Sequence, residues 1–124
     1  MTNDTFEPPV AVAVYRLYLS FAPQVFSFPK LYRHSLGGAI EKNFLMLLEI
    51  IFEANSMPRP LREAPLLGAH AKCELLKLLV RMSFELGIVT DKRYFELAAG
   101  LREIGKMLGG WMKFVRNGPY AKAE

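Results

Sequence analysis

The segment REIGKMLGGWMKFVRN, from Arg102 to Asn117, decides the fold class that the sequence predicts. Hydrophobic residues recur in it and just before it at alternating steps of three and four positions, at Leu101, Ile104, Leu108, Trp111 and Val115. This spacing is typical of the apolar seam of a helix that packs against other helices. Gly105, Gly109 and Gly110 interrupt the segment, although each glycine inside a helix costs about 1 kcal/mol relative to alanine. We therefore expect the backbone to approach a neighbouring element closely there.

The same helical periodicity extends toward the N-terminus and leaves almost nothing for strands. Pro23 should bend or end a first helix, Pro29 suits the first position of a second, and the loop at 55–60 contains two prolines. Gly87 is a typical C-cap for the third helix, and Thr90 can cap the fourth. The predicted helices cover about 10–26, 29–54, 62–87 and 91–117. Short connections between helices of similar length predict an all-α, up-down antiparallel four-helix bundle, a single domain over residues 1–124.

The composition indicates an oligomer in a reducing compartment. Hydrophobic residues make up 52% of the chain, which suggests that apolar surface is buried between subunits. The single cysteine, Cys73, excludes an intramolecular disulfide framework and fits the cytoplasm. Asp4 and Glu7 give the N-terminus the wrong charge for a signal peptide. The uncharged run from Leu17 to Pro29 is shorter than the roughly 20 residues that span a bilayer. We therefore expect a soluble, cytoplasmic protein.

No group of residues has the spacing of a catalytic or metal site. Helical metal sites combine a glutamate with a histidine three residues later, and no glutamate here has one. His70 and Cys73 are three apart and could touch one ion, but two ligands do not make a structural site. His34 follows Arg33 at the start of the second predicted helix, where a surface position is expected. The sequence thus predicts no enzyme, no metal and no cofactor.

Basic residues on the last two predicted helices carry the functional signal. The net charge of +4 favours an anionic partner, with nucleic acid first. Two basic residues lie one turn apart on the third predicted helix, and two more lie one turn apart on the fourth. Two further basic residues follow on the fourth helix. In chain order they are Lys77, Arg81, Arg102, Lys106, Lys113 and Arg116. In a bundle the two pairs could merge into one patch that contacts phosphates. The alternative is a solvated face that nearby acids partly neutralise, namely Glu74, Glu85 and Glu103.

Two segments resemble the accessory variability determinant (Avd) proteins of diversity-generating retroelements. The first is Phe28 to Arg33 with Leu36-Gly37 and Ile40-Glu41, which resembles the signature FPK-x-x-R-x-x-LG-x-x-I-E. The second, Ile104 to Lys113, resembles the signature IG-R/K-x-LGGW-I-K and is the more specific. The first signature is shared with a sister group, the four-helix-bundle proteins encoded in intervening sequences of bacterial ribosomal RNA genes. Between its second and third predicted helices this chain lacks that group's Ala-Glu-Gly stretch, so the Avd resemblance is favoured.

The resemblance implies a barrel-like homopentamer with a basic surface. Such a protein would bind the reverse transcriptase and template RNA or DNA, and would support mutagenic cDNA synthesis without catalysing it. We expect the six basic residues to make these contacts, although Glu96 and Glu103 should interrupt the basic face. The alternative is a homo-oligomeric protein-interaction bundle of the ribosomal RNA intervening-sequence type, with no role in nucleic-acid binding.

Overall fold

The computed structural model describes residues 8–118, and these residues are almost entirely helical. They form five α-helices and two 3₁₀ helices, and this part of the chain contains no strand. In order, the elements are α1 (Pro9–Phe21), η2 (Ala22–Ser27), α2 (Lys30–Arg33), α3 (Leu36–Ser56), η3 (Arg59–Leu61), α4 (Glu63–Glu85) and α5 (Asp91–Asn117). Asp4 and Glu7, which argued against a signal peptide, lie outside the described residues.

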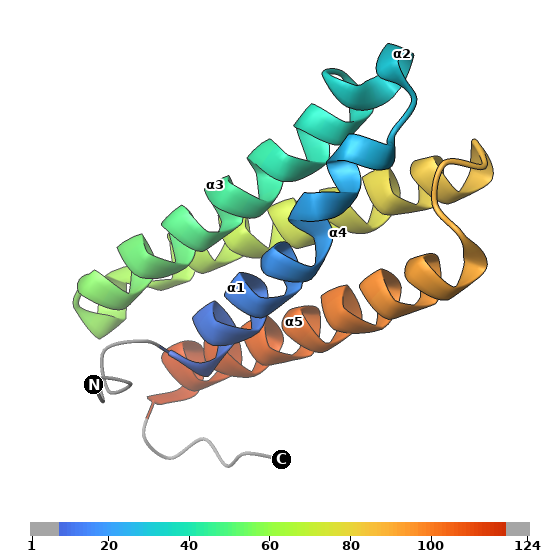
Figure 1. Ribbon diagram of the computed structural model, residues 1–124. Helices are drawn as coiled ribbons and strands as arrows, with labels where there is room; N and C mark the ends of the chain where they lie inside the picture. The colour runs from blue at the N-terminus through green and yellow to red at the C-terminus, as the bar shows by residue number, and fades with distance from the viewer. Residues whose placement is uncertain (1–7, 119–124) are drawn as a thin grey trace.

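The four longest helices form an antiparallel bundle, as predicted. Each of α1, α3, α4 and α5 runs opposite to the one before it (Figure 1). α1 packs against α3 and α5, and α4 packs against the same two helices. α1 and α4 therefore occupy opposite corners of the bundle. The short elements η2 and α2 form the corner that joins α1 to α3.

The core is built from one apolar seam on each helix. On α5 the first part of the predicted seam is buried, at Leu101, Ile104 and Leu108. The seam continues upstream to Leu97, whereas Trp111 and Val115 are only partly buried. Fully burying an aliphatic or aromatic side chain contributes about 1.5–3 kcal/mol, so these seams dominate the stability of the bundle. Outside α5, the largest fully buried side chains are Phe21, Phe28, Ile40, Phe44, Leu47, Ile51, Leu66 and Leu76.

The first helix is shorter than predicted. α1 ends at Phe21 instead of continuing to Phe26, and Ala22 to Ser27 form the 3₁₀ helix η2. The cause is Pro23, which has no amide hydrogen to continue the α-helical pattern after Ala22 donates to the Tyr18 carbonyl.

The second predicted helix, 29–54, is two helices. α2 ends at Arg33, a turn follows at His34 and Ser35, and α3 begins at Leu36. Short-range contacts accompany this break: the Arg33 guanidinium donates to the carbonyls of Phe26 and Phe28, which fastens α2 to the end of η2. The buried Phe28 ring packs against Gly37, where an added Cβ would lie 3.1 Å from the ring. The residues of the first signature thus build a sharp corner.

The glycines of the last helix differ in their surroundings. Gly105 faces the side chains of Lys77 and Cys73 on α4, but an added Cβ would lie 3.5 Å from the Lys77 Nζ atom, an ordinary contact, so no close approach requires glycine there. Gly109 and Gly110 have open space around them within the described chain, so the expected close approach is wrong there for a single copy. Among the glycines of α5, Gly100 has the nearest neighbour: an added Cβ would come within 2.7 Å of the Leu17 side chain on α1.

One segment is long and apolar enough to cross a membrane by length and composition alone, from Pro9 to Ser27. It comprises α1 and η2 and contains Pro23 between them. Its apolar content has two explanations within the fold. One face of α1 is buried in the core at Val10, Val14 and Phe21. Other large side chains of the segment, such as Tyr15 and Leu19, are exposed in a single copy.

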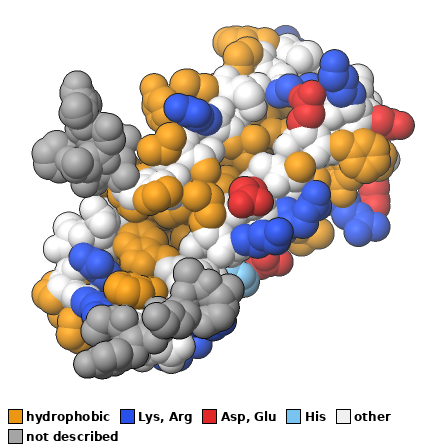
Figure 2. Space-filling model, turned by 90° about the horizontal axis from the view of Figure 1, so that it is seen from below, with side chains coloured by type: hydrophobic (Ala, Val, Ile, Leu, Met, Phe, Trp, Pro, Cys, Tyr) orange, Lys and Arg blue, Asp and Glu red, His pale blue; other side chains and the backbone are white. Residues whose placement is uncertain are grey.

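Exposed hydrophobic side chains are a general feature of this chain. Figure 2, seen from the side of α5, shows them interspersed with basic and acidic side chains, with no continuous field of one charge. Elsewhere, Phe26 and Leu31 at the η2–α2 corner are each 78% exposed. Large exposed apolar side chains in such numbers are typical of surfaces that meet another protein.

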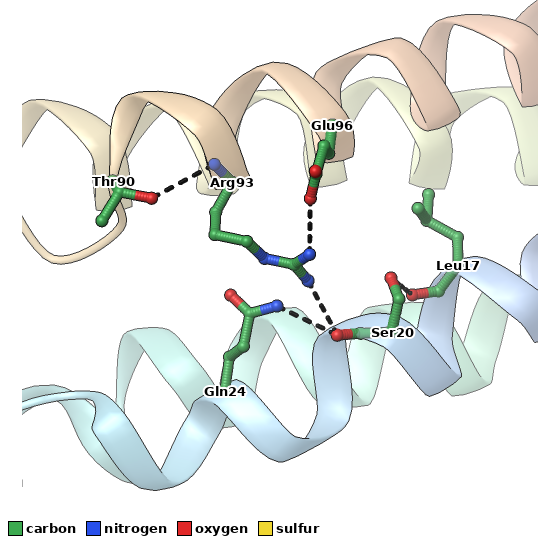
Figure 3. Close-up of polar contacts among 6 residues, drawn as sticks. All are labelled: Leu17, Ser20, Gln24, Thr90, Arg93 and Glu96. Carbon is green, nitrogen blue, oxygen red and sulfur yellow. Dashed lines mark hydrogen bonds and ion pairs between the residues drawn. The ribbon is translucent and has the colours of Figure 1, made fainter.

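Arg93 joins the start of α5 to the end of α1 (Figure 3). Its guanidinium donates to the Ser20 carbonyl at a distance of 2.8 Å. The same carbonyl also accepts a hydrogen bond from the Gln24 side-chain amide. Its backbone amide donates to the Thr90 hydroxyl, which therefore caps the N-terminus of α5. The cap leaves Arg93 in the first turn of α5, where its side chain reaches the last turn of α1.

Replacing Thr90 with alanine removes this cap. We expect Thr90→Ala to lower the free energy of unfolding by about 1 kcal/mol, the usual effect of losing an N-cap side chain. Urea denaturation followed by circular dichroism measures the change. Thr90→Ser is the matched control, because it keeps the hydroxyl and should stay close to wild type. Equal stability of the alanine and serine variants would contradict a capping role.

Candidate functional site

Three of the predicted basic residues line one groove between α4 and α5. Lys77 and Arg81 come from α4 and Arg102 from α5. The groove has a volume of about 370 Å³ and is completed by Glu74, Leu78, Tyr94 and Ala98. The two helices pack side by side, so basic residues far apart in sequence meet there. Lys106, the fourth member of the two predicted pairs, is exposed on α5 outside this lining.

Acidic neighbours on α4 offset much of the charge in the groove. The Lys77 ammonium lies 2.9 Å from the Glu74 carboxylate, and the Arg81 guanidinium lies 2.9 Å from that of Glu85. The hydrogen bond from Lys77 holds the pKa of Glu74 below its usual value, and the hydrogen bond to Glu85 raises the pKa of Arg81. The two ion pairs therefore offset the charges of Lys77 and Arg81.

Tyr94 is a groove residue that the sequence reasoning missed. Its ring stacks on that of Phe84, with centroids 4.3 Å apart and an angle of 15° between the planes. The sequence spacing could have predicted its position. Tyr94, Ala98 and Arg102 follow one another at steps of four residues, and residues at this spacing share one face of a helix. The stacked pair gives the groove an aromatic wall beside its charges.

The outer face of α5 carries basic residues without acidic partners. Arg102, Lys106 and Lys113 are exposed and follow one another at four and seven residues, which places them on one side of the helix over about 16 Å. Within residues 8–118 none of the three forms an ion pair. This row, defined as Arg102, Lys106 and Lys113, is the strongest uncompensated charge among the predicted residues.

The two acids expected to interrupt the basic face behave differently. Glu96 forms an ion pair with Arg93, whose guanidinium reaches the Ser20 carbonyl of α1 (Figure 3). Glu96 is therefore turned toward α1 and away from the row. Glu103 is exposed directly after Arg102 in the chain and remains beside the row.

Arg116 is engaged in a contact between helix ends. Its guanidinium makes two hydrogen bonds, of 2.8 and 3.0 Å, to one carboxylate oxygen of Glu63 at the start of α4. A second clamp, which the sequence reasoning also missed, comes from Arg59. Its guanidinium lies over the Phe114 ring, 4.4 Å from the centroid, and donates to the Phe114 carbonyl at 3.0 Å. Arg116 therefore fastens the bundle, unlike the free cations of the row.

The two residues considered as metal ligands point to different partners. The Cys73 thiol is buried and donates to the Leu101 carbonyl at 3.4 Å. His70 lies on the surface side of α4, with its Nε2 atom 3.9 Å from a Glu74 oxygen. In the part of the chain that the structure describes, no cluster of three or more potential ligands occurs. His34 is exposed immediately after α2.

Comparison with known proteins gives one match. A family model described as bAvd-like matches residues 13–115. The matched range includes both signature segments, the groove and the whole row. No curated protein matches the chain, and no solved structure matches it.

The buried Cys73 thiol should be unreactive in the native protein. Burial raises its pKa to about 11, so only about one molecule in a thousand carries a thiolate at pH 8. We expect Ellman's reagent at pH 8 to label the native protein very slowly and the unfolded protein at once in guanidinium chloride. Rapid stoichiometric labelling of the native protein would contradict the burial of this side chain.

Proposed function

Because this chain belongs to the bAvd-like family, we propose that it is the non-enzymatic accessory subunit of a diversity-generating retroelement. In this role a cytoplasmic homo-oligomer binds the element's reverse transcriptase and its template RNA and supports mutagenic cDNA synthesis. The family consists of accessory proteins and is not known for catalysis. The chemistry belongs to the polymerase, and this protein supplies a charged scaffold.

The row on α5 is the observation that carries the nucleic-acid part of the proposal. Its three cations project from one side of a regular helix and are not neutralised within residues 8–118. Such residues contact phosphates and position a nucleic acid without reading its bases. Assembly of several copies, in a pentamer as the resemblance implies, would repeat the row around one particle and strengthen its field.

The groove between α4 and α5 favours a second partner. Its charges are mostly paired, and the ring of Tyr94, which stacks on Phe84, forms an apolar part of its lining. Mixed apolar and paired-charge surfaces suit a protein better than a phosphate backbone. We infer that this groove contributes to binding the reverse transcriptase. A bundle that binds only proteins is the competing function, and it predicts no contribution of the row.

The experiment is the binding of a labelled structured RNA at several salt concentrations. Each phosphate contact contributes about 0.7–0.9 to the slope of log affinity against log salt. The triple variant Arg102→Ala, Lys106→Ala, Lys113→Ala should therefore lower the slope by at least 2 and weaken binding at low salt.

The matched control removes the same charge elsewhere. Arg16, Lys30 and Lys42 lie on α1, α2 and α3, are exposed, and form no ion pair among the described residues. Their triple alanine variant should keep most of the wild-type slope. An equal loss in both triple variants would mean that net charge alone drives binding, and wild-type binding in the α5 variant would refute a role for the row.

A further inference from the structure

Helix α4 is apolar on two faces. One face is buried in the bundle at Leu66, Ala69, Cys73, Leu76 and Val80. A second set of apolar residues recurs at three- and four-residue steps on the opposite, exposed face. This exposed stripe consists of Leu67, Ala71, Leu75, Leu78, Met82 and Leu86. The stripe extends over about 28 Å, most of the length of the helix. Charged side chains flank the stripe, but its own apolar side chains are exposed in an isolated copy.

A second exposed apolar surface lies between α1 and α3. A groove of about 280 Å³ is lined there by Ala11, Tyr15, Leu48 and Phe52. Tyr15 is 53% and Phe52 41% exposed, although both belong to otherwise well-packed helices. This surface is concave, whereas the exposed stripe is a ridge of side chains on a single helix.

The two surfaces lie on opposite corners of the same molecule. α1 and α4 share α3 and α5 as neighbours, so the ridge of α4 and the groove beside α1 face in different directions. A copy cannot cover its own stripe with its own groove. Contact between two different surfaces of identical chains is head-to-tail, and it forms a ring when the rotation between successive copies closes.

Charges beside the two surfaces are complementary. Lys72 lies three residues before Leu75 and therefore next to the stripe on the helix surface. Glu49 lies three residues before Phe52 and four after Leu45, at the edge of the α1–α3 surface. Neither Lys72 nor Glu49 forms an ion pair with any other described residue. Opposite charges at the rims favour the contact of this ridge with this groove over contact between two ridges.

We propose that the exposed stripe of α4 in one copy packs into the groove between α1 and α3 of the next copy. The inference rests on the homo-oligomer of the proposed function and adds the two faces that build it. Leu78 and Arg102 line the same groove between α4 and α5, so the contact between copies borders Arg102. Lys106 and Lys113 lie outside that groove and remain accessible in the assembly.

Cysteine cross-linking tests this arrangement directly. Tyr15→Cys and Leu78→Cys are prepared as separate proteins, mixed, refolded together and treated with a short bismaleimide. The inference predicts a covalent dimer in the mixture and none in either variant alone. Wild type is the control for the buried Cys73. A dimer formed by Leu78→Cys alone would mean that two stripes meet, and an oligomer without the mixed cross-link would equally overturn the inference.

Size-exclusion chromatography with light scattering separates this inference from the proposed function. Met82→Glu places a charge in the stripe and should convert the oligomer to monomer without loss of helicity. The control is Leu31→Glu, because Leu31 is more exposed but lies on α2, away from both surfaces. A Met82→Glu variant that remains oligomeric would overturn the inference alone. A monomeric wild type would also overturn the oligomer in the proposed function, whatever its affinity for RNA.

Discussion

The packing of α5 against α4 is the contact on which the rest of this structure depends. The seam of α5 from Leu97 to Leu108 is buried, and the Cys73 thiol of α4 donates to the Leu101 carbonyl of α5. Turning this seam inward fixes the rotation of α5 about its own axis. The same rotation directs Lys106 and Lys113 outward and places Tyr94 and Arg102 at the groove with α4. Core packing thus determines where the charge lies.

Arginine side chains fasten the ends of the helices to one another. Arg33 binds carbonyls at the end of η2, Arg93 binds the last turn of α1, and Arg116 binds Glu63 at the start of α4. A guanidinium presents several donors in a fixed plane, which suits carbonyl oxygens left without partners at helix ends. These arginines are therefore already bound within the bundle. The net charge of +4 overstates the number of basic side chains that can bind a ligand.

The apolar residues, like the basic ones, fall into two groups with different roles. One set forms the core of a single copy, and another set lies exposed on α4 and in the groove between α1 and α3. The high hydrophobic content is consistent with both requirements. A chain with two apolar corners and a basic outer helix has the surfaces that an accessory scaffold needs, since it can bind its own copies and still present charge to a polymerase and its RNA.

The sequence by itself determined the helical class, the bundle and the family, because each rests on local patterns. Helical periodicity depends on neighbours three and four residues away, and the signature at Ile104 to Lys113 is a continuous segment. It also placed basic residues on the last two helices. Only the tertiary structure decided which of them are free. The partner of Arg116 is 53 residues away at Glu63, and the Arg93 guanidinium binds the Ser20 carbonyl, 73 residues away. Such pairings depend on the rotation and register of whole helices against one another, which no local pattern specifies.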